Sequence, residues 1–160
     1  MRARVAFIIR DMMRDAAERG TGTPARKLVP AAIPVAGKTG TTNDNVDVWF
    51  MGMTPDLVAG VWLGFDRPKT IAPGVAGGSL AAPIWGAMMA KYYANRPMPA
   101  SAWTPPLGFV VAELDRATGL LADATTPPER RYTEYFIPGT EPEPLRSVPW
   151  KLAVFGAMTP

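Results

Sequence analysis

The chain contains neither cysteine nor histidine among its 160 residues. Without cysteine there are no disulfide bridges or thiol nucleophiles, and without histidine there is no Ser-His-Asp triad. The two absences together exclude zinc sites of the usual kind, whose ligands are cysteine and histidine side chains. Lack of cysteine suits an oxidising compartment without requiring one.

Long apolar runs and strong net charge are absent as well. The apolar run Val5 to Ile9 is too short for the hydrophobic region of a signal peptide, and no segment approaches the ~20 apolar residues of a membrane span. Net charge is only +3, from 17 basic and 14 acidic residues. Acidic residues alternate with the arginines of residues 2–19, which indicates a solvated helix face. We therefore expect no nucleic-acid partner and no membrane span.

Apolar spacing predicts two amphipathic helices in a chain that is 48% hydrophobic. The first covers residues 3–19 and ends at Gly20. Its apolar positions are Val5, Ile8, Met12 and Ala16. The second covers residues 79–95, with Ser79 as its cap and Pro83 in its first turn. Its apolar positions are Ile84, Met88 and Tyr92.

Strands are expected between these helices. Residues 46–53 and 57–65 are rich in β-branched and aromatic side chains and flank a short turn, so they predict a hairpin. We expect Trp49 and Trp62 to pack this hairpin onto a helix. Residues 27–36 are also β-like, but their two prolines place them at the edge of a sheet or on the approach to it.

Beyond the second helix the chain becomes rich in proline. Residues 96–106 have the composition of a linker. Residues 109–114 then predict a short strand, residues 115–119 a turn and residues 120–121 the returning strand. The rest of the chain is expected to be a loop-rich tail. Its aromatic anchors are Tyr132, Tyr135 and Phe136.

The motif Lys38-Thr39-Gly40-Thr41-Thr42 combines a lysine with three hydroxyl groups and is suited to binding an anion. A phosphate-binding P-loop would need a leading glycine where Ala32 stands, and a helix after the motif. Instead Pro34 removes an amide donor and a polar turn comes next, at residues 43–45. A polar hairpin turn without function is the other alternative, because short motifs match by chance.

A wider pattern favours a third interpretation. Four segments resemble, in order, the end of the transpeptidase domain of class A (bifunctional, high-molecular-weight) penicillin-binding proteins. They are residues 35–43, 47–55, 58–66 and 77–85. Glu18-Arg19-Gly20-Thr21-Gly22 is similar to the helix end that precedes the motif strand in this family. Two further segments are similar to the family's short C-terminal tail, residues 115–121 and 135–142.

This resemblance implies an α+β fold: an antiparallel sheet packed against helices, the C-terminal portion of a β-lactamase/transpeptidase-like fold. It divides the chain into a partial transpeptidase domain (1–96), a proline-rich linker (97–106) and a short hairpin with a loop-rich tail (107–160). We expect the chain to be the C-terminal part of a longer protein.

The family signature has three parts, Ser-x-x-Lys, Ser-x-Asn and Lys-Thr-Gly. Only the third is present, because none of Ser79, Ser101 and Ser147 begins Ser-x-x-Lys. Tyr93-Ala94-Asn95 imitates a variant of the second part, but it comes after Lys-Thr-Gly and falls near a predicted helix end, so we interpret it as coincidence. The chain alone is therefore expected to be inactive.

The resemblance also implies roles for the motif in serine acyl transfer. Lys38 would supply positive charge, and the hydroxyls of Thr39 and Thr41, with Thr42 beside them, would bind a substrate carboxylate. Gly40 would let an extended peptide lie along the strand. The backbone amide of Thr41 would be one donor of the oxyanion hole.

The implied partners are the peptidoglycan stem peptide ending in D-Ala-D-Ala, β-lactams, and an upstream transpeptidase half that this chain lacks. No cofactor or metal is implied. The implied location is the periplasmic, extracytoplasmic face of the inner membrane, although the chain carries no targeting segment. The alternative is a non-catalytic scaffold or binding module that holds a peptide carboxylate.

Overall fold

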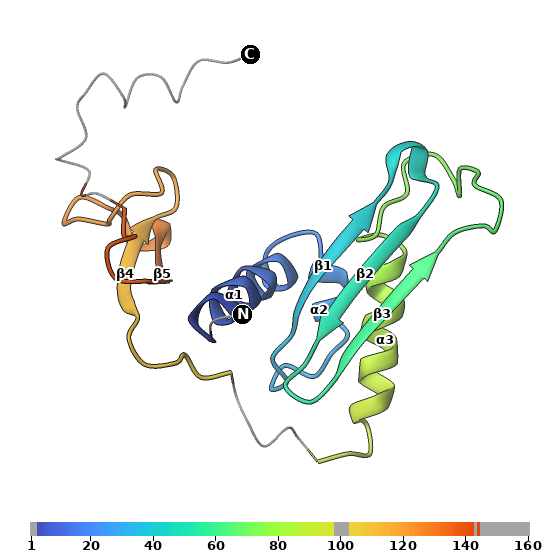
Figure 1. Cartoon of the computed structure of the whole chain (residues 1–160), viewed down its shortest axis with the longest axis horizontal. Helices are drawn as coiled ribbons and strands as arrows, with labels where there is room; N and C mark the ends of the chain where they lie inside the picture. Colours follow the sequence, from blue (N-terminus) through green and yellow to red (C-terminus); the bar gives the residue numbers. More distant parts are fainter. Residues whose placement is uncertain (1–2, 98–102, 143, 145–160) are drawn as a thin grey trace. The chain divides into compact units, whose positions relative to one another are not determined.

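The computed structural model describes residues 3–97, 103–142 and 144. Its internal contacts divide the chain into two compact units, residues 1–104 and 105–160. The first unit combines helices with an antiparallel sheet, and the second contains a small β-hairpin (Figure 1). The expected α+β class is thereby confirmed.

The first unit is built around a three-stranded antiparallel sheet in the order β1-β2-β3. Its elements are helices α1 (Ala3–Glu18) and α2 (Thr23–Arg26), strand β1 (Ala36–Thr41), the 3-10 turn η1 (Asn43–Asn45), strands β2 (Val48–Met53) and β3 (Val58–Leu63), and helix α3 (Ala81–Tyr93). Helix α1 lies beside β1, while α3 packs against β2 and β3 (Figure 1). The predicted hairpin is confirmed as β2 and β3.

The register of the sheet separates the motif side chains onto two faces. Thr39 lies opposite Phe50, and Lys38 lies opposite Met51. Because side chains alternate along a strand, Thr39 shares the face of the fully buried Phe50, and Lys38 shares the face of the exposed Met51. Thr39 and Thr41 therefore lie on the side of α3, and Lys38 lies on the opposite side.

The core of this unit centres on an aromatic contact between the sheet and α3. The rings of Phe50 and Trp85 meet edge to face, with centroids 5.3 Å apart, and both side chains are fully buried. The indole Nε1 of Trp85 donates a hydrogen bond of 3.0 Å to the carbonyl oxygen of Ala59 in β3. Burial of two large rings is the main apolar contribution here, and the indole hydrogen bond fixes their orientation.

Helix α3 buries a different face from the predicted one. Ile84 and Met88 are 47% and 40% exposed, so the prediction that they belong to the buried face is wrong. The buried side is formed by Ala81, Ala82, Trp85, Gly86, Met89 and Tyr93. Small residues decide the outcome: a Cβ at Gly86 would lie 2.5 Å from the carbonyl oxygen of Ala25, so only glycine lets α2 and α3 pack this closely.

Two smaller predictions for the helices are also corrected. Ser79 does not cap α3, whose N-cap is Leu80; its hydroxyl bonds the backbone of Ala76 in the preceding turn. In α1, Val5 and Met12 are exposed. The buried residues of α1 are Phe7, Asp11 and Ala17. Pro83 does fall in the first turn of α3, as expected.

The β-like segment 27–36 is not a strand, except for Ala36 at its end. Three of its carbonyl groups, those of Val29, Pro30 and Ala31, accept hydrogen bonds from the side chain of Arg26. The Arg26 guanidinium donates to the carbonyl oxygens of Val29 at 3.1 Å and Ala31 at 2.8 Å, and its Nε bonds Glu18 at 2.7 Å. Val29, Ile33 and Val35 still reach the core, which explains why the pattern looked like a strand.

Trp49 and Trp62 do not pack the hairpin onto a helix. They lie opposite each other on β2 and β3, on the face away from Phe50, with ring centroids 6.1 Å apart. They are 42% and 45% exposed, and the Trp62 indole donates to Asp47 at 2.9 Å. Trp85, which the sequence did not single out, takes the expected role.

The second unit is a hairpin of β4 (Val110–Asp115) and β5 (Arg131–Phe136), with a 3-10 turn, η2 (Pro128–Arg130), before β5. Residues 120–121 do return beside the end of β4, as predicted, although as an antiparallel bridge of Leu121 to Leu114 and not as a full strand. The Asp115 amide donates to the Leu120 carbonyl oxygen, and the Ala122 amide donates to that of Glu113, each at 2.9 Å. The pairing strand is the segment expected to be a loop-rich tail. The Asp115 carboxylate accepts a hydrogen bond from Arg130 Nε at 2.8 Å, which joins the end of β4 to the start of β5. This bond also keeps the pKa of Asp115 below its usual value.

Parts of the two C-terminal segments proposed from the sequence lie outside the described residues. These are residues 98–102 of the linker and residues 143 and 145–160 of the tail. The boundaries of the three proposed segments stay a prediction.

Gly52→Ala is expected to lower the free energy of unfolding by about 1–3 kcal/mol. An ideal Cβ at Gly52 would lie 2.5 Å from the Trp85 ring and 2.7 Å from the Phe50 ring, and neither buried ring can move away. Chemical denaturation measures the change. Gly60→Ala is the matched control, because its Cβ would meet only the flexible thioether of Met51. Equal loss in both variants would contradict this account of the core.

Tyr93→Phe tests the polar contact that joins α3 to the β2–β3 turn. The Tyr93 hydroxyl, in a side chain 5% exposed, bonds the Thr54 hydroxyl at 2.6 Å and the Asp56 carboxylate. The variant removes the hydrogen bonds that the Tyr93 hydroxyl makes, while the buried Thr54 hydroxyl keeps its bond to Asp56 at 3.0 Å, so we expect a loss of about 1–2 kcal/mol by denaturation. Tyr92→Phe is the control.

The stability of the wild type and that of Tyr93→Phe should depend differently on pH in the alkaline range. Burial and the Asp56 hydrogen bond raise the pKa of Tyr93 from 10.0 to about 12. The folded state then holds this proton more tightly than the unfolded chain, so its stabilisation is complete below pH 10 and is lost as pH rises to about 12. The stability difference between the wild type and Tyr93→Phe should therefore shrink over that window. A stability difference that stays constant between pH 10 and about 12 would contradict the raised pKa of Tyr93.

Candidate functional site

The motif is itself the edge strand β1, not the turn after a strand. Residues 36–41 pair only with β2 in the part of the chain that the structure describes, so the other edge of β1 has no neighbouring strand there. The turn at residues 43–45 is confirmed as η1, where Asp44 and Asn45 adopt positive φ of 58° and 53°. Asp and Asn tolerate this conformation better than most side chains.

Lys38, Thr39 and Thr21 form a polar cluster. The Lys38 ammonium donates a hydrogen bond of 2.9 Å to the Thr39 carbonyl oxygen and lies 3.5 Å from the Thr39 hydroxyl oxygen. Since neighbouring residues point to opposite faces, this contact requires the lysine to curl around the open edge of β1. On the other side, the Thr39 and Thr21 hydroxyl oxygens are 2.7 Å apart. Thr21 belongs to the turn between α1 and α2.

Thr41 is held by the loop between β3 and α3. The backbone amide of Gly77 donates to the Thr41 hydroxyl oxygen at 3.1 Å. The α-carbon of Gly77 packs onto the sheet itself: an added Cβ would lie 2.7 Å from the Gly40 carbonyl oxygen and nearer still to that of Trp49. The loop from β3 to α3 therefore contacts the middle of the motif directly.

The other two motif residues, Gly40 and Thr42, affect the backbone of β1 and the turn that follows it. A Cβ at Gly40 would lie 3.3 Å from the Cβ of Trp49, so a side chain there would crowd the neighbouring strand. The Thr42 hydroxyl accepts a hydrogen bond of 2.8 Å from the Asp47 amide and so closes the turn to β2. The predicted substrate-binding role of Thr42 stays a prediction, as do the roles of Lys38, Thr39, Gly40 and Thr41.

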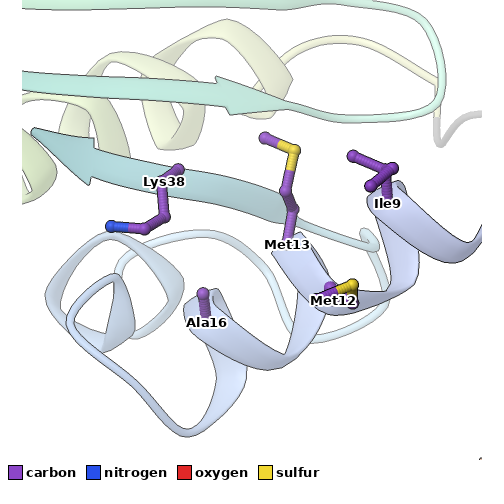
Figure 2. A pocket seen from close by; sticks show the side chains of 5 residues that line it. All are labelled: Ile9, Met12, Met13, Ala16 and Lys38. Carbon is purple, nitrogen blue, oxygen red and sulfur yellow. The ribbon is translucent and has the colours of Figure 1, made fainter.

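An apolar pocket of about 270 Å³ lies between α1 and β1 beside the motif. It is lined by Ile9, Met12, Met13, Ala16 and Lys38. Figure 2 shows the lysine closing one end, with its ammonium pointing away from Met13 and Ile9. The methylene stem thus packs against apolar surface while the charge stays at the polar cluster. An ammonium beside hydroxyl groups, at an open strand edge, can bind an extended peptide that ends in a carboxylate.

Two other kinds of feature do not occur among residues 3–97, 103–142 and 144. No group of three or more carboxylate, histidine or cysteine side chains that could hold a metal ion is present there. Within the same residues, no helix is long and apolar enough to cross a bilayer.

Comparison with known proteins identifies the family. The profile of the penicillin binding protein transpeptidase domain matches residues 1–90. The chain belongs to the penicillin-binding protein transpeptidase family. A second profile, the C-terminal domain of penicillin-binding protein 1A, matches residues 105–145. The resemblance inferred from the motif strands is confirmed.

Relatives in this family extend well beyond this chain. It is 40% identical to penicillin-binding protein 1A of Pseudomonas aeruginosa over 147 residues, which is 92% of this chain and 17% of that protein. It is 45% identical to the Neisseria gonorrhoeae protein of the same name over 82 residues, 51% of this chain and 10% of that one. A crystal structure of penicillin-binding protein 1A from Haemophilus influenzae superposes with a TM-score of 0.71 at 30% identity, covering 87% of this chain and 21% of that one.

Sequence reasoning found the motif but gave no role to the groups that hold it. Thr21 and Gly77 appeared only as parts of longer similar segments. Neighbouring glycines could have pointed to both residues: Thr21 stands between Gly20 and Gly22, and Gly77 is followed by Gly78. Glycines mark close approaches of backbone, but they do not say which segment approaches.

Gly77→Ala is expected to displace the loop from β1, because the new methyl group would collide with two backbone carbonyls that cannot rotate away. We expect a loss of about 1–3 kcal/mol in unfolding free energy and NMR shift changes centred on Gly40 and Thr41. Gly64→Ala is the control, since its Cβ would meet only side chains, those of Trp62 and Asp47. Undisturbed β1 resonances in Gly77→Ala would rule out the contact.

Proposed function

We propose that this chain forms the carboxylate-binding side of a peptidoglycan D,D-transpeptidase. The observation that carries the proposal is the polar cluster of Lys38, Thr39 and Thr21, with the Thr41 hydroxyl two residues further along the same edge strand, in a chain that belongs to the transpeptidase family. The chain spans about a sixth of the Pseudomonas relative, so the whole protein's activity and partners are part of the proposal.

The reaction would be acyl transfer to a serine and then to an amine. The serine oxygen attacks the carbonyl of the penultimate D-alanine, and the C–N bond to the terminal D-alanine breaks, so that residue leaves as a free amino acid. An amine from a neighbouring stem peptide then attacks the acyl ester, which forms the cross-link and releases the serine. β-Lactams would imitate the donor peptide and leave the serine acylated.

In this scheme, the residues of this chain bind and orient the donor. The Lys38 ammonium and the hydroxyls of Thr39 and Thr41 would hold the terminal carboxylate by charge-assisted hydrogen bonds. The backbone of β1 around Gly40 would pair with the extended peptide. The Thr41 amide would be one of two donors to the developing oxyanion, the second coming from the nucleophile's own backbone.

The nucleophile would come from an upstream transpeptidase half. The exposed apolar face of the sheet supports such a partner. Its members are Trp49, Met51, Val58 and Trp62, each at least 42% exposed. Apolar groups gathered on one face are suited to packing against further protein. We place the site at the extracytoplasmic face of the inner membrane, with peptidoglycan stem peptides and β-lactams as its ligands, and we propose no cofactor.

Covalent labelling with a fluorescent penicillin tests this function. The 160-residue chain alone should not label, and the protein extended upstream along its reading frame should. In the extended protein, Lys38→Ala and Thr41→Val should each slow labelling about tenfold or more, because each removes a hydrogen bond to a carboxylate. Lys91→Ala on α3 and Thr133→Val on β5 are the matched controls.

Three results would count against the proposal. Labelling of the 160-residue chain would show that its own residues supply a nucleophile. No labelling of the extended protein would remove the enzyme and favour a non-catalytic module that holds a peptide carboxylate. Equal effects of Lys38→Ala and Lys91→Ala would mean that the β1 cluster does not bind the carboxylate.

A further inference from the structure

Each hydroxyl of the proposed carboxylate site is paired with a group from outside its own strand. The Thr39 hydroxyl meets the Thr21 hydroxyl at 2.7 Å, and the Thr41 hydroxyl meets the Gly77 amide at 3.1 Å. These two outside groups come from segments far apart in the sequence, one before β1 and one after β3. Their convergence on alternate residues of one strand needs an explanation.

Hydrogen-bond direction supplies one. A hydroxyl has one proton to donate and two lone pairs to accept with, whereas an amide N–H and an ammonium can only donate. Gly77 therefore occupies a lone pair of Thr41 and leaves the proton of that hydroxyl unused. Among the described residues, the bond from Gly77 is the only hydrogen bond in which the Thr41 side chain takes part. That proton is available for a ligand.

Donors and acceptors can be counted in the same way for the Thr39 hydroxyl. Its hydroxyl oxygen faces the Lys38 ammonium at 3.5 Å, which can only donate to it. In the pair with Thr21 either oxygen could be the donor. If Thr21 donates, Thr39 keeps its proton for a carboxylate. If Thr39 donated to Thr21, its proton would be spent inside the protein and a carboxylate oxygen would face only lone pairs.

One loop holds both outside groups in place. Gly77 lies against the Gly40 backbone, and a Cβ at the next residue, Gly78, would lie 2.6 Å from the carbonyl oxygen of Thr21. The end of α1 restricts Thr21 from the other side: a Cβ at Gly22 would lie 3.0 Å from the α-carbon of Ala17. Thr21 is therefore fixed between helix and loop, with its hydroxyl directed at Thr39.

We infer that Thr21 and the Gly77 amide are positioning groups that set the Thr39 and Thr41 hydroxyls as donors toward an anionic carboxylate. The inference rests on the proposed function and deepens it. It assigns part of the selection of a charged carboxylate over a neutral carboxamide to groups outside the motif, in addition to the charge of Lys38. Thr21 acts through Thr39 and does not itself touch the ligand.

The test compares two ligands on the full 160-residue chain by NMR titration: N-acetyl-D-alanyl-D-alanine and its C-terminal amide. The wild type should prefer the acid. Thr21→Val, which has the same shape but no donor, should weaken binding of the acid about fivefold and leave the amide unchanged. Thr21→Ser should restore the preference, and Thr133→Val on β5 serves as the control.

The outcomes separate this inference from the proposed function. A wild-type preference that Thr21→Val leaves intact, or equal weakening of both ligands, would overturn the role of Thr21 while the carboxylate site stands. No preference in the wild type would overturn the site itself, and the inference with it.

A second measurement needs no ligand. Amide hydrogen exchange at Gly77 should speed up about tenfold in Thr41→Val, which lacks the acceptor, and stay slow in Thr41→Ser, which keeps it. Unchanged exchange in Thr41→Val would show that Gly77 does not donate to Thr41 and would overturn that half of the inference. This result holds even if Thr21→Val proves too unstable to titrate.

Discussion

The edge-to-face contact between Phe50 and Trp85 is the interaction on which the rest of the first unit depends. It joins the central strand to α3 and fixes how closely helix and sheet approach, because glycine at position 52 leaves room for both rings. The Trp85 indole also bonds β3, so one side chain ties two strands to the helix. The loop between β3 and α3 is then held at both ends. Its Gly77 can reach β1 only because those ends are placed correctly.

The candidate site is best understood as a surface assembled from three places in the chain. The edge strand provides an ammonium and two hydroxyls, the α1–α2 turn provides Thr21, and the loop before α3 provides Gly77. None of these groups is a strong acid or base, which suits a surface that binds and orients a substrate. The chemistry that we propose needs a nucleophile from elsewhere, and this division of labour agrees with a chain that covers only part of its relatives.

Sequence predicted the elements of this fold better than their contacts. β-Branched and aromatic residues on both sides of a short turn identified the hairpin of β2 and β3, because such residues favour strand geometry locally. The same residues could not say which face is buried, so Trp49 and Trp62 were expected to pack the hairpin onto a helix, whereas Trp85 of α3 makes that contact with the sheet. Residues 27–35 looked like a strand because three of their side chains reach the core (Val29, Ile33 and Val35), while the side chain of Arg26 bonds the carbonyls of Val29 and Ala31. The pairing of β4 with β5 was missed because Asp115 and Arg130, which hold it, are 15 residues apart.

Gly37, the residue before the motif lysine, has a consequence for the pairing of β1. It lies opposite Gly52, and a Cβ there would lie 2.5 Å from the tip of the Phe50 ring. If β1 slid by one residue along β2, a side chain would have to occupy this space. The same slip would turn Lys38 toward α3 and both threonines toward α1. The absence of a single side chain therefore acts as a register stop, and it decides which face of the sheet carries the charge and which carries the hydroxyls.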